Sequence, residues 1–188
     1  MALRAYAEYH LDQVWFIPAG HSPNKNEEQM TDAGMRLEMC QLAVHPYEFF
    51  KVCGIEVAAQ ETSYTYRTLQ KLTLQYPQDE FYFIMGADSL DYFDKWYHPE
   101  IIASLAHILV VNRDEFSEND LNQKAEEIQK LFTADIQIVH CKKYMISSHE
   151  IRDSIKNHKN VNQYLAEEVV HYINEHHLYQ SNGEIAWN

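Results

Sequence analysis

The sequence predicts an α/β protein whose parallel sheet is covered by helices on both faces. Short apolar segments such as residues 81–85 and 108–111 have the composition of strands buried on both sides. Segments with helical spacing alternate with these strands, the order that builds a doubly wound parallel sheet. The 188 residues suffice for a sizeable core, so we expect one domain over residues 1–180 and a frayed tail over 181–188.

The expected elements follow one another with short connections. The predicted strands are residues 14–17, 52–57, 81–85, 108–111 and 136–139. The predicted helices lie near 32–44, 66–74, 101–105 and 120–132, with two more that start at 147 and span 163–177. Such folds bind ligands beyond the carboxyl ends of their strands, so the residues after each strand are the first candidates for a site.

Charge and cysteine content exclude several classes of protein. The net charge of -13 argues against nucleic acid or an anionic membrane as the main partner. Cys40, Cys53 and Cys141 are far apart and odd in number, which predicts a reduced, cytoplasmic protein without disulfides. No apolar segment approaches the length of a membrane span, and no signal peptide is recognisable. His171 and His176 are too poorly aligned on one helix to predict a metal site.

The stretch MISSHEIRD predicts a helix that begins at Ser147. The Ser147 side chain can accept a free backbone N–H of the first turn, and Glu150 can reach back to the N–H of Ser147. Ile146 and Ile151 have the spacing of a hydrophobic staple. This combination predicts a capping box at the amino end of the helix.

Arg152 is unexpected in this position, because it places a cation near the positive end of the helix dipole. The dipole disfavours such a cation by about 0.3–1 kcal/mol unless a negative group lies nearby. Ser147, Ser148 and Arg152 together with free N–H groups can hold a phosphate. The alternative is that Arg152 pairs with a surface carboxylate.

Two other cations are expected at the same edge of the sheet. Lys25 follows the first predicted strand and Arg113 follows the fourth. Because the carboxyl ends of parallel strands lie at one edge, these residues and Arg152 are predicted to gather there. Taken one at a time, each is better explained as a solvated surface charge, and it is their shared position at strand ends that favours a site.

Gly86 and Asp88 follow the third predicted strand. Gly86 allows a ligand to approach the backbone, and the Asp88 carboxylate suits a ribose hydroxyl, although Asp88 can instead cap the next helix. Trp96 follows shortly and can stack on a flat ring, with ordinary packing as the alternative.

The order of these motifs resembles bacterial nicotinate-nucleotide adenylyltransferases, which are nucleotidyltransferases with a Rossmann-like doubly wound sheet. The matching pieces run over nearly the whole chain: FIPAG with Lys25, Arg36 with Met39, Ser63-Tyr64-Thr65 with Thr68-Leu69, GADSL with Trp96, residues 107–113, ISS with Ile151-Arg152, and Val169 with Tyr172-Ile173 and Leu178-Tyr179. The Ile-Ser-Ser-x-x-Ile-Arg and Gly-x-Asp-Ser-Leu…Trp pieces are the more specific.

The resemblance implies adenylyl transfer from ATP to nicotinate mononucleotide, giving deamido-NAD and pyrophosphate, with Mg²⁺. It implies that Ser147, Ser148 and Arg152 hold the ATP phosphates and that Gly86 and Asp88 contact the adenosine ribose.

For nicotinate mononucleotide, the resemblance implies that Trp96 stacks on the pyridine ring. Backbone groups around Thr65 and Tyr97 would meet the nicotinate carboxylate. Lys25 is the candidate for the mononucleotide phosphate, and Arg113 is a weaker candidate on the phosphate side.

The sequence departs from the family pattern in two places. Asn24 stands where a His usually precedes the Lys, and no Gly-rich strand with His-x-Gly-His is found. That strand would be central in the sheet. We expect that either the sequence is truncated or it belongs to a degenerate member of the family. In both cases we expect weak transfer activity. The alternatives are a related adenylyltransferase of the phosphopantetheine type and a non-catalytic nucleotide-binding module. The sequence does not determine the oligomeric state, and a homo-oligomer is one possibility.

Overall fold

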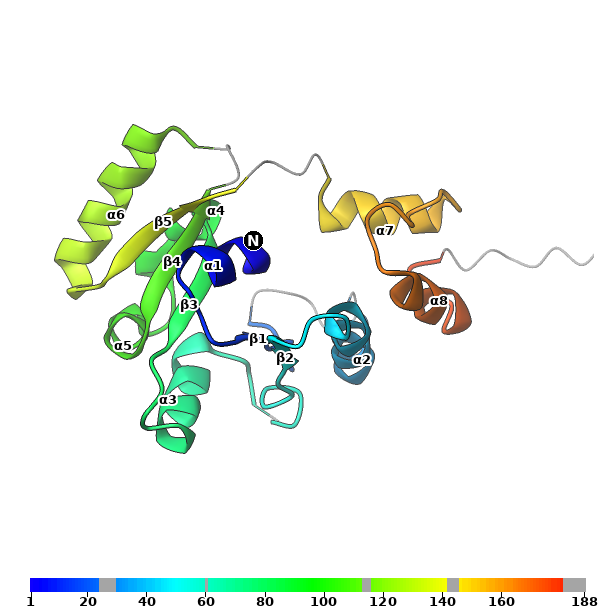
Figure 1. The fold of residues 1–188 in the computed structure, drawn as a ribbon, viewed down its shortest axis with the longest axis horizontal. Helices are drawn as coiled ribbons and strands as arrows, with labels where there is room; N and C mark the ends of the chain where they lie inside the picture. The colour runs from blue at the N-terminus through cyan, green and yellow to red at the C-terminus, as the bar shows by residue number, and fades with distance from the viewer. Residues whose placement is uncertain (24–29, 60, 113–115, 142–145, 181–188) are drawn as a thin grey trace, which may run out of the picture.

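The computed structural model describes residues 1–23, 30–59, 61–112, 116–141 and 146–180, in which helices and strands alternate (Figure 1). The strands are β1 (Val14–Phe16), β2 (Phe50–Val52), β3 (Tyr82–Gly86), β4 (His107–Asn112) and β5 (Ile136–His140). The helices are α1 (Ala2–Glu8), α2 (Ala33–Val44), α3 (Thr65–Gln75), α4 (Ala87–Leu90), the 3-10 turn η2 (Phe93–Lys95), α5 (Pro99–Leu105), α6 (Glu118–Phe132), α7 (Ser148–Lys156) and α8 (Glu167–Glu175). The alternation confirms the predicted α/β class.

Every described strand pair is parallel, as predicted. β1 pairs with β2, and β4 lies between β3 and β5 in a second sheet. Tyr82 of β3 is opposite His107 of β4, and Ile108 of β4 is opposite Ile136 of β5. The carboxyl ends of β3, β4 and β5 therefore lie at one edge of the second sheet.

Helices cover both faces of β4. Ile108 and Val110 are fully buried in a cluster with side chains of α5 and α6. Leu109 and Val111 are fully buried in a separate cluster with Ala5 of α1. Because successive side chains of a strand point to opposite faces, both faces of this sheet are packed. The doubly wound, Rossmann-like arrangement is thus confirmed.

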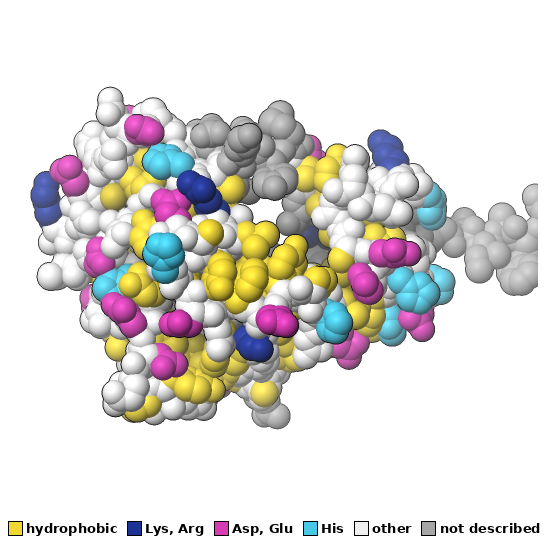
Figure 2. All heavy atoms as spheres, viewed as in Figure 1, with side chains coloured by type: hydrophobic (Ala, Val, Ile, Leu, Met, Phe, Trp, Pro, Cys, Tyr) yellow, Lys and Arg dark blue, Asp and Glu magenta, His cyan; other side chains and the backbone are white. Residues whose placement is uncertain are grey.

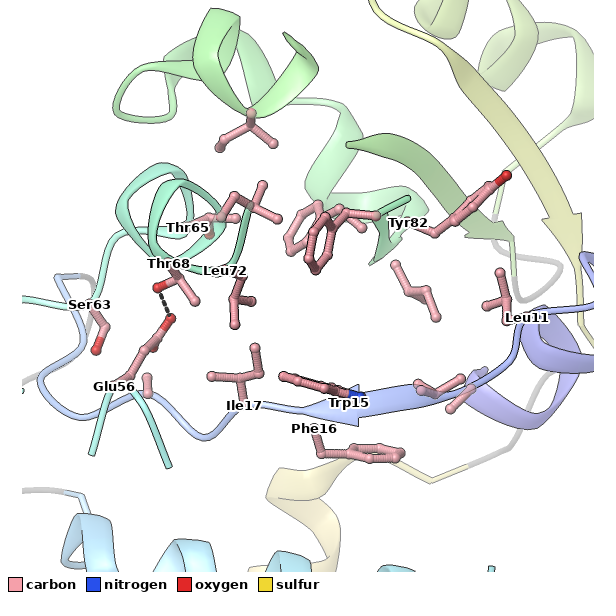
Figure 3. A pocket seen from close by; sticks show the side chains of 18 of the residues that line it. Leu11, Trp15, Phe16, Ile17, Glu56, Ser63, Thr65, Thr68, Leu72 and Tyr82 are labelled. Atoms are coloured by element: carbon pink, nitrogen blue, oxygen red, sulfur yellow. Dashed lines mark hydrogen bonds between the residues drawn. The ribbon is translucent and has the colours of Figure 1, made fainter. Parts of the chain in front are cut away.

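Within the described residues, no strand pairing joins the two sheets. In the described ranges, β1 pairs only with β2 and β3 pairs only with β4. A hollow of about 1720 Å³, which we call the inter-sheet hollow, is lined by residues 11–17 on one side and 78–84 on the other (Figure 3).

Two predicted elements are wrong in their extent. The strand predicted over 52–57 ends at Val52, because the backbone then turns and the N–H of Ala58 donates to the carbonyl of Gly54 at 2.9 Å. The last helix was predicted over 163–177, but α8 covers only Glu167–Glu175. A turn precedes it, in which the N–H of Tyr164 donates to the carbonyl of Val161 at 2.9 Å.

Helices α7 and α8 pack with α2 beside the β1–β2 sheet (Figure 1). Ile155, Val161, Val169 and Ile173 form the buried centre of this group. The hydroxyl of Tyr172 on α8 donates to Glu38 on α2 at 2.6 Å, and this bond to the carboxylate raises the pKa of Tyr172 to about 12. None of the helices in the described ranges is long and apolar enough to span a membrane.

His107 ties together the amino ends of β3, β4 and β5. Its Nδ1 lies 2.5 Å from Asp135 and its Nε2 lies 2.7 Å from Glu80. The Tyr82 ring stacks on the imidazole, with centroids 4.8 Å apart. The hydrogen bond with Asp135, supported by Glu80 and opposed by partial burial, raises the pKa of His107 above its ordinary value.

We expect this cluster to make stability depend on pH. Because the folded pKa of His107 is raised, its contribution is fully present below its unfolded pKa of about 6.5 and is lost as pH rises through the folded pKa. His107→Gln should therefore lower the melting temperature more at acidic than at basic pH. The control is His149→Gln, which removes an exposed ion pair with Asp153. A His107→Gln effect that is independent of pH would contradict the assignment.

Candidate active site

The amino end of α7 is built as predicted. The N–H of Glu150 donates to Oγ of Ser147 at 3.2 Å, and the N–H of Ser147 donates to the Glu150 carboxylate at 2.6 Å. These two bonds form the capping box. The side chain of Ser147 and its backbone N–H, both close to the Glu150 carboxylate, lower the pKa of Glu150. Ile151 packs into the cluster that α7 shares with α8. The cap uses the N–H of Glu150 and leaves other N–H groups of the first turn without an intrahelical partner.

Ser148 and Arg152 lie on one side of the exposed first turns of α7. They are separated by one turn, and both side chains are exposed. Across the described ranges, no carboxylate forms an ion pair with Arg152. The alternative that Arg152 pairs with a surface carboxylate therefore finds no support there. A dianion or polyanion at this end would meet two hydroxyls, free N–H groups and a guanidinium.

Gly86 and Asp88 lie at the carboxyl end of β3. Gly86 is the last residue of the strand and also the N-cap of α4, which begins at Ala87. A Cβ on Gly86 would overlap Oδ1 of Asp88, so a larger residue here would force the Asp88 carboxylate to move. Asp88 lies inside the first turn of α4 and does not cap a helix at Ser89, so the capping alternative is wrong.

Thr65, Trp96 and Tyr97 line the same end of the inter-sheet hollow, and Figure 3 shows Thr65 beside Thr68. Thr65 is the first residue of α3, whose N-cap Tyr64 makes no side-chain cap, so the first-turn N–H groups lack that partner. Tyr97 is 57% exposed, and its ring lies 4.9 Å from that of Tyr64.

Trp96 is half-buried and also packs against the protein. Its ring meets Phe83 edge-on, with centroids 5.9 Å apart and planes at 74°, and Phe93 at 5.6 Å. It reaches the hollow as well. One part of the Trp96 ring is therefore packed against the protein, and another part faces the inter-sheet hollow.

Lys25 and Arg113 lie outside the described residues, so their predicted meeting with Arg152 is not tested. Asn112, the residue before Arg113, ends β4 with 2% of its surface exposed. Its amide donates to the carbonyl of Phe116 at 2.9 Å. β4 thus ends at a fixed position beside Gly86 and the end of β5.

Comparison with known proteins shows which family the chain belongs to. The cytidylyltransferase-like family matches residues 1–154. A probable nicotinate-nucleotide adenylyltransferase of Lachnoclostridium phytofermentans is 32% identical over 179 residues, which cover 95% of this chain and 90% of the relative. One of Clostridium perfringens is 34% identical over 180 residues, covering 96% and 89%. The chain belongs to the nicotinate-nucleotide adenylyltransferases.

Solved structures share the fold of this adenylyltransferase family member. Plasmodium falciparum nicotinic acid mononucleotide adenylyltransferase complexed with NaAD superposes with a TM-score of 0.71 at 20% identity, over 90% of this chain and 83% of that one. The same enzyme complexed with APC gives a TM-score of 0.67 at 19% identity, over the same shares. At this identity the likeness supports the Rossmann-like fold only.

Sequence reasoning assigned no role to the residues that fix the turn after β1. The N–H of Gly20 donates to Oγ of Ser63 at 2.9 Å, and Arg36 donates to the carbonyl of Gly20 at 3.1 Å. Glu56 accepts from the Thr68 hydroxyl at 2.5 Å beside this turn (Figure 3). These bonds hold the carboxyl end of β1 against the first turn of α3, where the candidate acceptor site lies.

The described residues contain no group of three or more His, Cys, Asp or Glu side chains that could hold a metal ion. A nucleotidyltransferase of this family generally requires a divalent cation. Mg²⁺ commonly arrives on substrate phosphates with few protein ligands. The donor set of Ser147, Ser148 and Arg152 suits the phosphates and offers no carboxylate directed at a cation.

Proposed function

We propose that this adenylyltransferase transfers the adenylyl group of ATP to nicotinate mononucleotide, giving deamido-NAD and pyrophosphate. The observation that carries the proposal is the amino end of α7, where Arg152 lies one turn above a capped helix start without a carboxylate partner in the described ranges. A polyphosphate is the ligand that makes this cation favourable at that end of the helix.

On the ATP side, Ser147, Ser148 and Arg152 hold the phosphates. The Ser147 hydroxyl oxygen accepts from the N–H of Glu150, and its side chain also interacts with the Glu150 carboxylate. Gly86 lets the adenosine approach the backbone, and Asp88 accepts from a ribose hydroxyl. Mg²⁺ enters as the cation of the ATP substrate and neutralises phosphate charge.

On the acceptor side, Trp96 stacks on the pyridine ring, and backbone N–H groups around Thr65 and Tyr97 receive the nicotinate carboxylate. The uncapped first turn of α3 and the exposure of Tyr97 support this assignment. Lys25 binds the mononucleotide phosphate, with Arg113 as a further candidate, and both roles rest on the sequence alone.

The reaction needs no covalent protein intermediate. An oxygen of the mononucleotide phosphate attacks the α-phosphorus of ATP, the bond to the β-phosphate oxygen breaks, and pyrophosphate leaves. The protein contributes position and charge neutralisation, since both reactants carry negative phosphates.

The test is formation of deamido-NAD with an equal amount of pyrophosphate from ATP, Mg²⁺ and nicotinate mononucleotide. Nicotinamide mononucleotide and phosphopantetheine are run as competing acceptors, because neither acceptor preference is fixed by the fold. If phosphopantetheine is the only acceptor that gives product, the protein is an adenylyltransferase of the phosphopantetheine type, and the proposal is wrong. Calorimetry that detects binding of ATP, in a sample that forms no product with either acceptor, would leave a non-catalytic nucleotide-binding module.

Trp96 gives a second test, which separates stacking from packing. Trp96→Phe keeps a flat ring, whereas Trp96→Leu keeps apolar volume and removes the ring. We expect Trp96→Leu to weaken the binding of nicotinate mononucleotide by about 2- to 12-fold, the equivalent of roughly 0.5–1.5 kcal/mol of stacking. The affinity for ATP should be unchanged. Trp96→Phe should lose less of the affinity for nicotinate mononucleotide. Equal losses for both nucleotides, measured by calorimetry, would make Trp96 a packing residue.

A further inference from the structure

Four aromatic rings join the start of α3 to the residues just before α5. The Tyr64 ring lies 4.9 Å from that of Tyr97 and 6.1 Å from that of Tyr66, centroid to centroid. The imidazole of His98 lies 4.8 Å from the Tyr66 ring and 4.5 Å from the Tyr97 ring. These contacts hold together the two backbone segments that are proposed to receive the nicotinate carboxylate.

The guanidinium of Arg67 packs beside two of these rings. Its Cζ lies 5.6 Å from the centroid of the Tyr64 ring and 5.7 Å from that of Tyr66, the range of a cation–π contact. Its Nε donates to the Tyr66 hydroxyl at 2.8 Å, and its Nη1 donates to the Glu61 carboxylate at 3.0 Å. Three contacts therefore hold this cation in place, although 41% of the Arg67 side chain is exposed.

Arg67 lies in the first turn of α3, a turn without an acidic residue or a side-chain cap. The N–H groups of Arg67 and Thr68 donate to the carbonyl of Tyr64 at 3.0 and 3.2 Å. The N–H groups of Thr65 and Tyr66 donate in none of the hydrogen bonds between described residues. The free N–H groups, the helix dipole and the guanidinium therefore all favour an anion at this helix start.

Carboxylates around the same helix start have the opposite effect. Glu61, which is 63% exposed, lies three positions before the N-cap Tyr64, and Glu56 accepts from the Thr68 hydroxyl (Figure 3). The chain carries a net charge of -13, and Figure 2 shows Asp and Glu side chains spread over one face of the molecule. Such charges repel a carboxylate and leave a neutral carboxamide nearly unaffected. The ion pair with Arg67 offsets the charge of Glu61.

We propose that the Arg67–Glu61 ion pair sets the preference of the acceptor site between nicotinate and nicotinamide mononucleotides, with Arg67 as the specificity-determining residue that favours the acid. Tyr64, Thr65 and Tyr97 line the inter-sheet hollow, whereas Arg67 does not, so Arg67 acts by its charge across the Tyr64 ring. At physiological ionic strength the Debye length is about 8 Å, so salt screens this charge only in part. This inference rests on the proposed adenylyl transfer.

The first test compares Arg67→Met with the parent chain, using both mononucleotides with ATP and Mg²⁺. Methionine keeps a long apolar side chain against the rings and removes the charge. We expect the ratio of kcat/KM for nicotinate over nicotinamide mononucleotide to fall by about 2- to 5-fold, as for an exposed charge near a helix start. Arg67→Lys keeps the charge and should retain most of the ratio. A pure packing role would lower kcat/KM for both mononucleotides equally, and an unchanged ratio would overturn the proposal.

Glu61→Gln tests the opposite sign. Glu61 is exposed, so this substitution leaves the packing of α3 intact. We expect the ratio to rise, and the double variant Arg67→Met/Glu61→Gln should return close to the parent ratio, because both charges of the pair are then gone. A ratio that falls in Glu61→Gln would contradict the assignment.

Lys71→Met is the matched control for loss of a cation. Lys71 lies one turn further along α3 and lines the same shallow surface pocket as Arg67. It makes no described contact with the four rings, so its removal should change the ratio less than Arg67→Met does. An equal change in the two variants would mean that any nearby cation suffices and would overturn the specific role of Arg67.

Calorimetry separates failure of this inference from failure of the proposed function. If the parent chain neither binds nor adenylylates either mononucleotide, the proposed function fails and the inference fails with it. If the parent chain uses nicotinate mononucleotide and the affinity ratio is the same in Arg67→Met, only the inference is overturned. At about 1 M NaCl the Debye length falls to about 3 Å, and the difference between the two chains should largely disappear. A difference of unchanged size would show that Arg67 acts by shape and would overturn its electrostatic role.

Discussion

Arg152→Ala is expected to weaken the binding of ATP by about 10- to 150-fold. This range corresponds to roughly 1.5–3 kcal/mol, the contribution of a hydrogen bond to a charged group. Arg152 lies one turn above the capped start of α7, and no carboxylate of the described ranges pairs with it. The guanidinium can donate to phosphate oxygens in a bidentate fashion, so Arg152→Lys should recover only part of the affinity. Calorimetry with ATP and Mg²⁺ measures the effect.

The melting temperature distinguishes this role from a structural one. Removing a cation near the positive end of the helix dipole should leave the unliganded protein as stable as before, or slightly more stable. Lys156→Ala is the matched control, because Lys156 is the basic residue in the last turn of the same helix, far from the free N–H groups. A large loss of stability in Arg152→Ala with normal ATP binding would show that Arg152 is structural.

The start of α7 could be predicted from sequence because its interactions are local. Ser147 and Glu150 are three residues apart, and their two hydrogen bonds involve nothing outside the first turn. The strands β3 and β4 were predictable for a similar reason, since burial on both faces leaves a continuous apolar segment in the sequence. Local chemistry therefore predicted these elements and the capped start of one helix.

The contacts around Gly20 could not be predicted in this way. Ser63 reaches the N–H of Gly20 from 43 positions away, and Arg36 reaches its carbonyl from 16 positions away. No periodicity or local motif relates such residues, because only the pairing of β1 with β2 and the start of α3 bring them together. Prediction of the strand over 52–57 failed for a related reason, since the apolar pattern continues into a turn whose hydrogen bonds the pattern does not reveal.

Gly20→Ala is expected to destabilise the fold and the acceptor site together. A Cβ at this position would overlap the backbone carbonyl of Glu56, and a backbone atom cannot move aside as a flexible side chain can. Overpacking of this kind costs about 1–3 kcal/mol. For a chain of 188 residues that corresponds to a melting temperature lower by about 2–12 °C.

The same substitution should affect the two nucleotides unequally. Gly20 is held by Ser63 and Arg36 beside the first turn of α3, whereas the amino end of α7 makes no described hydrogen bond to this turn. Nicotinate mononucleotide should therefore bind more weakly in Gly20→Ala than in the parent chain, with ATP binding preserved at temperatures where the variant is folded. Gly34→Ala is the control, because its Cβ would meet only the Asp32 side chain in the first turn of α2, where alanine favours the helix. Equal melting temperatures for Gly20→Ala and the parent chain would mean that the turn after β1 adjusts freely and does not position the acceptor site.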